Sequence, residues 1–296
     1  MAYSEPFGLL LLDKPVGPTS HDIVNQVRRL TGVRKVGHTG TLDPMASGLL
    51  VLCLGPATRL SEYLTQHDKG YWTVLRFGVG TDSHDATGEV LKEGGRIPKR
   101  RQLESALAHF RGSIEQRPPD YSAVKIAGKR AYELARAGRK PALASRTVRI
   151  ERLELLSYDP PDLELHIECS AGTYIRSLAR DLAESLGTEA HLTRLQRTRV
   201  GSFQLEQAQS LEELTEAVEA GDWEQFIIPA AEALPEIPSI VLDEVQMEHV
   251  QHGRRLPREF PDAGLARALT PEGELAAILE AGEENDHWQP RKVFLS

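Results

Sequence analysis

The chain has 296 residues, of which 40% are hydrophobic, so it is long enough for one large domain followed by a small one. No apolar run approaches the length of a membrane span, and the first residues lack the basic start and long apolar stretch of a signal peptide. We therefore expect a cytoplasmic protein with no membrane partner. Cys53 and Cys169 lie in apolar runs without a Cys-x-x-Cys motif, so we expect two reduced core residues.

The formal net charge of −8 hides a division along the chain. Residues 201–296 contain 6 basic and 20 acidic side chains, whereas residues 1–200 contain 29 basic and 23 acidic ones. The segment 96–152 alone contains 15 basic and 5 acidic residues. An ordinary solvated surface usually mixes both signs, so this asymmetry favours a polyanion, such as a nucleic acid, as the partner of the basic part.

The first half of the chain mixes apolar strands with amphipathic helices. Pro15 stops the first apolar run, and the helix that follows has Thr19 or Ser20 as its cap and Gly32 at its end. Apolar runs and alternation predict strands over 8–15, 48–55 and 71–80, an extended stretch over 113–127, and helices over 19–32, 56–66, 99–112 and 129–138.

The second half begins with two paired strands. The patterns predict strands over 146–158, 162–172 and 191–203, a helix over 173–187, and an acidic helical stretch over 205–234. Two prolines in 234–239 mark a boundary, after which about five short elements remain. Strands and helices do not alternate as regular βαβ units. We therefore expect an α+β fold, with a mixed, largely antiparallel central sheet and flanking helices over 1–235, and a small C-terminal domain over 236–296.

The loop 37–48, "GHTGTLDPMASG", contains a lone carboxylate, Asp43. Gly37, Gly40 and Gly48 permit backbone conformations that other residues resist, and Pro44 fixes the residue after the aspartate. The loop lacks the Lys-Ser/Thr ending of a phosphate-binding P-loop. As a bare pattern it is typical of a turn, because aspartate side chains bond nearby backbone amides, and a functional carboxylate is the alternative.

The stretch "GTYIRS", 172–177, places a cation where a helix disfavours it. With Thr173 as the N-cap, Arg176 falls in the first turn, where the helix dipole favours anions. This arrangement indicates an anionic partner for the guanidinium, either a phosphate or a buried carboxylate. The alternative is an exposed arginine without a specific partner, because such dipole effects are small.

Several aromatic residues lie near basic ones. Tyr71 follows a glycine at the start of a strand, and Trp72 should face the opposite side of the sheet. Such rings can stack on an extruded base, at about 1–3 kcal/mol per base, or they can belong to the core. The histidines and cysteines have no metal-site spacing, so we expect no metal ion.

Four blocks occur together and in order: "LLLLDKPVGPTSHDIV", "KVGHTGTLDPMASGLL", "RPPDYSAVKIAGKRAYELAR" and "CSAGTYIRSLARDLA". They resemble the bacterial tRNA pseudouridine-55 synthases of the TruB family over about residues 7–203. The resemblance implies a pseudouridine synthase fold with a C-terminal PUA-like domain. It also implies isomerisation of uridine 55 in the TΨC loop of tRNA, without metal or cofactor. The partner would be the T stem-loop of tRNA, and the enzyme a monomer with no obligate protein partner.

The resemblance also implies roles for single residues. Asp43 matches the catalytic aspartate, and Arg176 matches the arginine that pairs with it. Tyr71 matches the tyrosine that stacks on the flipped base and is implicated in removing the proton from its C5. Other matches are Tyr174 and Leu195 in the pocket, His38, which enters the RNA where the base has left, Lys14 and Pro15 beneath the site, and Lys125, Lys129 and Arg130 in an RNA-gripping insertion near 117–146.

These residues fit the chemistry of the isomerisation. The C1′–N1 bond breaks, the uracil turns, and C5 joins C1′, so nothing is added and no cofactor is needed. The base must first leave the stack, which costs a few kcal/mol. Asp43 can attack the anomeric carbon, as in retaining glycosidases, or take a proton from the sugar to give a glycal. Either role needs an ionised carboxylate in a dry pocket, which an adjacent arginine favours.

Three other functions remain open at this stage. A guide-dependent pseudouridine synthase of the archaeal type would need partner proteins. A tRNA chaperone with a decayed site would need none of Asp43, Tyr71 and Arg176. A nucleobase-removing hydrolase would need a second acid, which the motifs do not offer. Formation of pseudouridine in an unmodified tRNA transcript distinguishes these alternatives.

Overall fold

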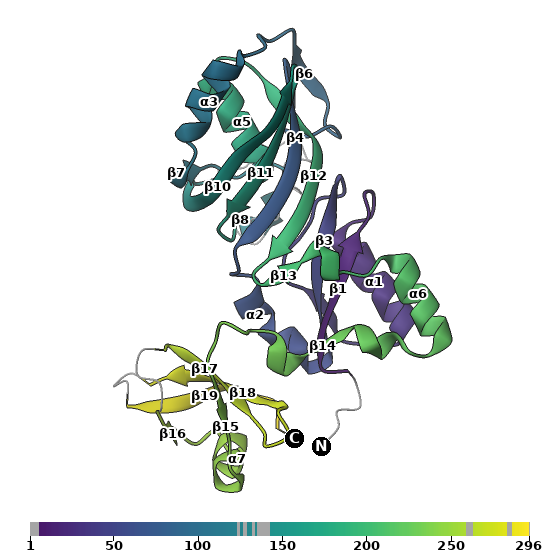
Figure 1. The fold of residues 1–296 in the computed structure, drawn as a ribbon, viewed down its shortest axis with the longest axis vertical. Helices are drawn as coiled ribbons and strands as arrows, with labels where there is room; N and C mark the ends of the chain where they lie inside the picture. Colours follow the sequence, from purple (N-terminus) through teal and green to yellow (C-terminus); the bar gives the residue numbers. More distant parts are fainter. Residues whose placement is uncertain are drawn as a thin grey trace.

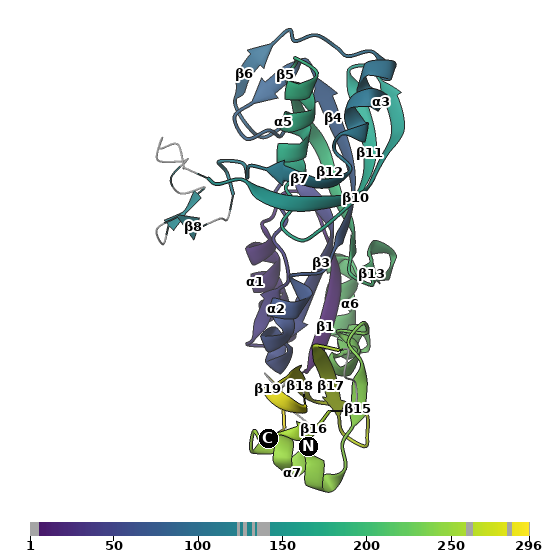
Figure 2. The same cartoon turned by 90° about the vertical axis from the view of Figure 1, so that its left-hand side faces the viewer.

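Two β-sheets, joined end to end, organise the molecule (Figures 1 and 2). The computed structural model describes residues 6–122, 125–126, 129–131, 134, 143–258, 263–282 and 286–295. The large central sheet carries helices on its faces, and the second, smaller sheet packs against one end of it. No helix in the described part of the chain is long and apolar enough to cross a membrane.

In these residues the central sheet has ten strands and is mixed, as the sequence predicts. Its main path runs β14-β1-β3-β12-β4-β11-β10-β7, with β13 beside β12 and β2 beside β3. The described part of β12 pairs with β3 in parallel, and the other pairs of this sheet are antiparallel. The strands are β1 Gly8–Lys14, β2 Val36–His38, β3 Ala46–Leu54, β4 Lys69–Phe77, β7 Gly112–Gln116, β10 Arg146–Asp159, β11 Asp162–Cys169, β12 Ala190–Val200, β13 Phe203–Gln204 and β14 Ile227–Pro229.

The flanking helices follow their sequence signals closely. Thr19 caps α1 in a capping box with Asp22, and Gly32 ends it in the left-handed conformation, because only glycine adopts that conformation freely. Ile23 and Val27 of α1 are fully buried against the central sheet. The helices are α1 Ser20–Thr31, α2 Ser61–Leu64, α3 Arg100–Ala108, α5 Ile175–Ser185, α6 Leu211–Ala220 and α7 Glu244–Gln251, with short 3₁₀ turns at Gly55–Leu60, Leu205–Gln207, Trp223–Phe226 and Ala230–Glu232.

The second sheet lies wholly after residue 238 and runs β15-β17-β18-β19-β16. Trp288 is fully buried in its own apolar core, beside α7. Phe294 packs on Phe7 of the N-terminal part, with ring centroids 4.9 Å apart, so the two sheets share a contact. The described strands are β15 Ser239–Val241, β16 Leu256–Pro257, β17 Leu265–Leu269, β18 Leu275–Ala281 and β19 His287–Val293. The domain boundary after residue 235 stays a prediction.

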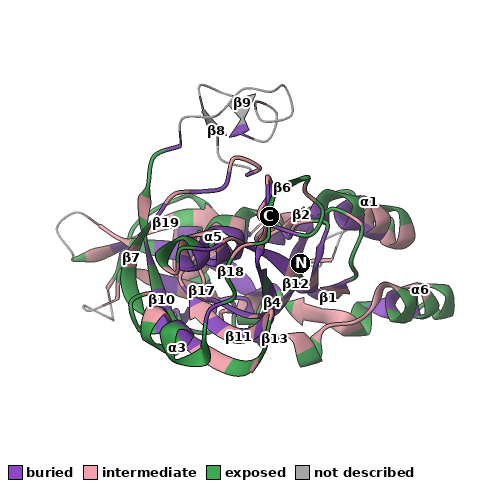
Figure 3. Ribbon diagram, turned by 90° about the horizontal axis from the view of Figure 1, so that it is seen from above, coloured by how far each residue is buried: buried purple, intermediate pink, exposed green. Residues whose placement is uncertain are grey.

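Some elements differ from expectation. The strand expected over 71–80 breaks at Gly78, whose φ is +89°, and continues as β5 Val79–Thr81, paired with β6 Val90–Glu93. The helix expected over 129–138 is wrong at its start, where β9 Lys129–Arg130 pairs with β8 Lys125–Ile126. Figure 2 shows β8 standing apart from the body, and Figure 3 shows exposed residues on the outer helices α1, α3 and α6. Much of the expected insertion near 117–146 lies outside the described residues. The acidic stretch 205–234 is helical mainly in α6, and β14 interrupts it because Ile227 and Ile228 pair with β1; the 3₁₀ turn Ala230–Glu232 follows.

Gly48 sets how closely β3 and β12 approach. Its φ is +99°, and a Cβ at this position would lie 2.3 Å from the backbone oxygen of Arg197. Both the conformation and the space therefore require glycine.

We expect Gly48→Ala to lower the free energy of unfolding by more than about 2 kcal/mol, because backbone strain and a backbone clash add. Urea unfolding followed by circular dichroism measures this. Gly32→Ala is the matched control, since Gly32 also has a positive φ, +73°, but open space around it. It should cost about 1 kcal/mol, and equal costs for the two variants would contradict the close approach.

Candidate active site

The loop that contains Asp43 is clamped to the start of α1. The hydroxyl of Ser20 accepts a hydrogen bond from the backbone N–H of Leu42 at 2.8 Å and donates to the carbonyl of Leu42 at 3.1 Å. The N–H of Gly17 donates to the carbonyl of Pro44 at 2.8 Å. These contacts fix the backbone on both sides of Asp43, in addition to a local turn in which the Asp43 carbonyl accepts from the Ala46 N–H at 3.0 Å.

Asp43 and Arg176 form the expected ion pair. Nε of Arg176 lies 2.9 Å from Oδ2 of Asp43, and the two side chains are 5% and 34% exposed, respectively. The guanidinium also donates to the carbonyl of Ser83 at 3.0 Å through Nη1 and to that of Tyr121 at 2.8 Å through Nη2. A nearly buried arginine is thus held rigidly beside a carboxylate that remains accessible from solvent.

The start of α5 differs from prediction by two residues. Thr173 is not the N-cap: the helix begins at Ile175 after Tyr174, and the Thr173 hydroxyl donates to the carbonyl of Ser170 at 2.9 Å. Arg176 is still in the first turn, as expected. The carboxylate of Asp43 is the anionic partner that this position requires.

Asp85 is a second carboxylate at the site, and the sequence analysis missed it. Its Oδ2 lies 3.7 Å from Nε of Arg176, and it is 4% exposed. Its Oδ1 accepts hydrogen bonds from the Ser83 hydroxyl at 2.8 Å and from the N–H and hydroxyl of Thr87 at 3.0 and 2.6 Å. The stretch "TDSHDATG" has the composition of an ordinary turn, so no sequence signal distinguishes this aspartate.

Tyr71 and Leu195 lie in one apolar cluster with Met45. Tyr71 is 7% exposed on β4, and Leu195 is 8% exposed on β12 opposite Ala46 of β3. Trp72 points to the other side of the sheet, as predicted, and its indole N–H donates to a glutamate of β11. The structure therefore brings the tyrosine and the leucine together beside the loop that contains the catalytic candidate.

Tyr174 is held through its backbone. Gln116, which is fully buried at the end of β7, donates to the Tyr174 carbonyl at 3.1 Å and accepts from its N–H at 2.8 Å. The guanidinium of Arg146 lies over the Tyr174 ring, 4.8 Å from its centroid. A cation on one face of a ring is a favourable contact, and here it orients a half-buried tyrosine next to Arg176.

Lys14 is the last residue of β1, and His38 is the last residue of β2, which leads directly to Asp43. The ammonium of Lys14 is buried and donates to the carbonyls of Pro15 and Pro18, both at 2.8 Å. Burial lowers the pKa of Lys14 to about 8, and the charge of Asp43 opposes this effect. Burial also lowers the pKa of His38, whose Nδ1 accepts from the Gly40 N–H at 3.3 Å.

The remaining predicted residues are Lys125, Lys129 and Arg130. They belong to β8 and β9, and their side chains lie outside the described part of the chain. Among the described residues, no group of three or more His, Cys, Asp or Glu side chains could hold a metal ion.

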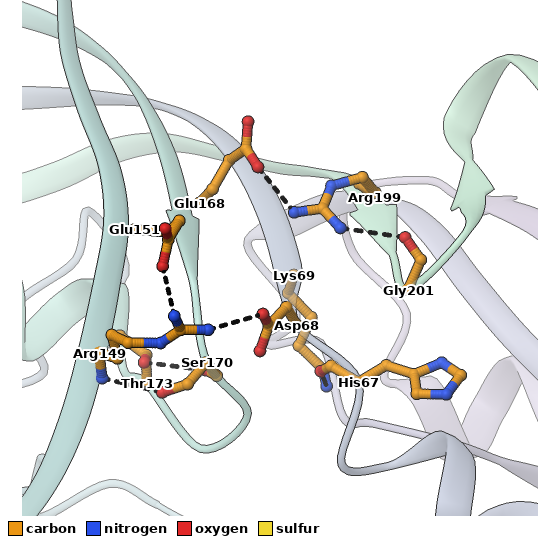
Figure 4. Close-up of polar contacts among 10 residues, drawn as sticks. All are labelled: His67, Asp68, Lys69, Arg149, Glu151, Glu168, Ser170, Thr173, Arg199 and Gly201. Atoms are coloured by element: carbon orange, nitrogen blue, oxygen red, sulfur yellow. Dashed lines mark hydrogen bonds and ion pairs between the residues drawn. The ribbon is translucent and has the colours of Figure 1, made fainter. Parts of the chain in front are cut away.

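A further polar network lies on the central sheet (Figure 4). Arg149 bridges Asp68 and Glu151 at 3.3 and 2.6 Å, and Arg199 pairs with Glu168 at 2.8 Å. The Arg149, Asp68 and Glu151 side chains are about half exposed. Exposed pairs contribute about 0–1 kcal/mol each, so this network offers control positions for variants of the site.

The Ser20 clamp can be tested by its effect on stability. Ser20→Ala removes a hydroxyl that bonds both backbone groups of Leu42 and leaves the buried N–H without this partner. We expect the free energy of unfolding to fall by about 1–3 kcal/mol. Thr19→Ala, which removes only the exposed helix cap, should cost about 1 kcal/mol. Urea unfolding of both variants measures the difference, and a Ser20→Ala cost near zero would contradict the clamp.

Comparisons with known proteins agree with this geometry. Residues 28–175 match the TruB family pseudouridylate synthase (N terminal domain), residues 176–235 the tRNA pseudouridylate synthase B C-terminal domain, and residues 238–295 the tRNA pseudouridine synthase II, C terminal, domain. The relatives named tRNA pseudouridine synthase B include those of Thiobacillus denitrificans, 44% identical over 97% of this chain and 95% of that protein, and Syntrophobacter fumaroxidans, 40% identical over 99% of both.

A solved structure shares the whole fold. The crystal structure of a Cbf5-Nop10-Gar1 complex contains a chain that is 29% identical and superposes with a TM-score of 0.76, over 98% of this chain and 85% of that one. The three family models together span both sheets, and the relatives are 40% or more identical over nearly the whole chain. The chain belongs to the TruB family of pseudouridylate synthases.

Proposed function

We propose that this protein isomerises uridine 55 in the TΨC loop of tRNA to pseudouridine. The ion pair between Asp43 and Arg176, beside Tyr71, is the observation that carries the proposal. The isomerisation needs one ionised carboxylate at a base-sized site and no added group. The names of the full-length relatives, at 40% identity or more, supply the substrate class.

Asp43 acts on the sugar of the target uridine. Its carboxylate is one-third exposed, so it can reach a ligand, whereas Arg176 behind it cannot leave. An ionised Asp43 attacks C1′ to form a covalent intermediate, or it takes the C2′ proton to form a glycal; both routes break the C1′–N1 bond. In both, the uracil is released within the pocket, turns, and bonds to C1′ through C5.

Arg176 keeps the carboxylate charged and correctly placed. Its Nη1 and Nη2 are bonded to two carbonyls, so the guanidinium cannot rotate away when Asp43 reacts. Asp85 adds a second negative charge and balances the buried guanidinium during the interval in which Asp43 is consumed. Such fixed charges need no reorganisation at the moment of reaction, which is the usual source of electrostatic catalysis.

The uracil lies between Tyr71 and Leu195 after it leaves the stack. Stacking on Tyr71 offsets the cost of extruding the base, since each such contact is worth about 1–3 kcal/mol. Tyr174 closes the pocket on the Arg176 side, and His38 enters the RNA where the base has left. Lys14 supports the loop from below through its two carbonyl contacts.

The basic segment 96–152 holds the RNA backbone. Lys125, Lys129 and Arg130 belong to the hairpin of β8 and β9, and β8 stands apart from the body (Figure 2). Phosphate contacts of this kind position a nucleic acid without reading its sequence. The acidic C-terminal residues, with 6 basic and 20 acidic side chains from 201 onward, contribute little to this grip.

The protein works as a monomer, without a protein partner or a cofactor. Cbf5 in the matched structure is complexed with Nop10 and Gar1, which favours a guide-dependent enzyme as the second candidate. The identity to that chain is 29%, whereas relatives named for tRNA reach 44% over almost the full length. Incubation of the purified protein with an unmodified tRNA transcript, followed by mass spectrometry for pseudouridine at position 55, tests the proposal directly. Activity that appears only after partner proteins are added would contradict it.

Asp43→Asn should abolish product formation and leave tRNA binding within about twofold. The amide has nearly the same shape but neither attacks C1′ nor accepts a proton. Single-turnover assays and filter binding measure the two quantities. Asp68→Asn, at the half-exposed position shown in Figure 4, is the control and should retain full activity. Turnover of Asp43→Asn near the rate of the unaltered protein would refute the role of the carboxylate.

Neutralising Lys125, Lys129 and Arg130 together to Gln should weaken tRNA binding and flatten its dependence on salt. Each lost phosphate contact reduces the slope of log K against log salt by about 0.7 to 0.9. Binding titrations at several salt concentrations measure the slope. The matched control replaces Arg254, Arg255 and Arg291 of the C-terminal unit. Only the variant of the β8–β9 hairpin should change the salt slope. An unchanged slope would exclude this hairpin from the phosphate contacts.

A further inference from the structure

Arg197 is the most unusual charged residue outside the pair already described. It lies on β12 directly opposite Tyr71 of β4 and is 1% exposed. Its Nε donates to the Leu49 carbonyl at 2.8 Å and its Nη2 to the Gly40 carbonyl at 3.1 Å. Within the described residues it has no carboxylate at ion-pair distance. A buried guanidinium without an anion is costly, so its retention requires a reason beyond packing.

Two further buried cations lie near Arg197. Lys14 donates to two carbonyls, and the ammonium of Lys69 donates to the carbonyls of Thr65 and His67 at 3.0 and 2.6 Å. The positive charge of Arg197 contributes to the lowered pKa of each lysine, which is about 8 in both cases. The three side chains donate to carbonyl oxygens, and nearby carboxylates, Asp43 for Lys14 and Asp68 for Lys69, oppose the lowering of the two lysine pKa values. Of the three cations, Arg197 is the one whose charge acts on the Tyr71 phenol.

The phenol of Tyr71 lies beside the charge of Arg197. The two residues are directly opposite each other on β4 and β12, so their buried side chains project from the same face of the sheet. Because an arginine can only donate, the phenol oxygen can only accept from it. We propose that Arg197 is the positioning residue of Tyr71, holding the ring in place and stabilising negative charge on its oxygen when it removes the C5 proton. This inference rests on the proposed function and adds a residue to it.

The step that Arg197 assists balances in atoms and charge. When C5 has bonded to C1′, it carries both C1′ and its original hydrogen, and N1 is doubly bonded to C6. The phenolate oxygen of Tyr71 takes the proton from C5, and the C–H electrons form the C5–C6 double bond. N1 then accepts a proton from solvent, equal to the one that the phenol released when it ionised.

The electrostatics of Tyr71 show why assistance is needed. Burial raises the pKa of Tyr71 to about 12, and the charges of Cys169 and Asp43 act in the same direction. The neighbouring positive charge of Arg197 acts against them. A donor near an oxygen that becomes negative favours the anionic form of that group. Loss of Arg197 therefore raises the pKa of the Tyr71 phenol and leaves less phenolate to remove the proton.

The first test measures Tyr71 directly, without activity. Ultraviolet difference titration of the protein minus that of Tyr71→Phe isolates this phenol. Arg197→Met should raise its pKa, and Arg197→Lys should raise it less. Arg199→Met is the matched control, because Arg199 is on the same strand but pairs with Glu168 (Figure 4), and it should leave the titration unchanged. An unchanged Tyr71 titration in Arg197→Met would overturn the proposal.

The second test separates this role from a structural one. Arg197→Met should slow single-turnover isomerisation about a hundredfold, typical for loss of one such donor. The kinetic isotope effect with tRNA that carries deuterium at uridine C5 should increase, because proton removal becomes limiting. Fluorotyrosine at position 71, a more acidic phenol, should restore part of the rate. A slower variant with an unchanged isotope effect and no recovery would show that Arg197 only supports the backbone. Absence of pseudouridine with the unaltered protein would instead refute the proposed function.

Discussion

The ion pair between Asp43 and Arg176 joins two parts of the chain that are far apart in the sequence. Asp43 comes from a loop that Ser20 clamps, and Arg176 comes from the first turn of α5. The carbonyls of Ser83 and Tyr121 complete the shell around the guanidinium. Breaking this pair would leave the nearly buried guanidinium with the longer contact to Asp85, at 3.7 Å, as its remaining carboxylate partner among the described residues. The Asp43–Arg176 pair therefore contributes both to the geometry of the pocket and to the stability of the residues around it.

The treatment of charge around the site follows one rule. Cations behind the pocket are satisfied by backbone carbonyls, which accept hydrogen bonds but cancel no charge: Lys14, Lys69 and Arg197 all follow this pattern. Two carboxylates, Asp43 and Asp85, lie against Arg176. These cations oppose the desolvation of anions in the pocket, and the proposed reaction generates anions, since the carboxylate must be ionised and the uracil leaves with its bonding electrons. Burial of uncancelled positive charge reduces stability and is retained where chemistry uses it.

The sequence predicted elements whose signals are local. The apolar run before Pro15, the cap at Thr19 and the end at Gly32 are decided by neighbouring residues, and the structure has them. The unfavourable position of Arg176 in its helix correctly indicated an anionic partner. The sequence did not predict Arg197 and Asp85, because their roles depend on contacts between distant segments. The stretch "LQRTRV" is typical of a half-exposed strand, and "DSHDAT" is typical of a turn. Thr173 was misassigned because its hydroxyl bonds backward, to Ser170. Gly37 and Gly40 needed no unusual φ, whereas Gly48 did.

The site is anchored before the chain enters the basic insertion. Gln116, the last residue of β7, bonds both backbone groups of Tyr174. The carbonyl of Arg117 then accepts from Ser177 and Arg180 of α5 at 2.8 and 3.0 Å. These contacts fix the first residues of the insertion to the helix that carries Arg176. The Tyr121 carbonyl, four residues further on, accepts from Arg176 itself. Under the proposed function, RNA contacts made beyond Tyr121 therefore leave the reacting groups in place, because the chain up to that point is already bound to α5.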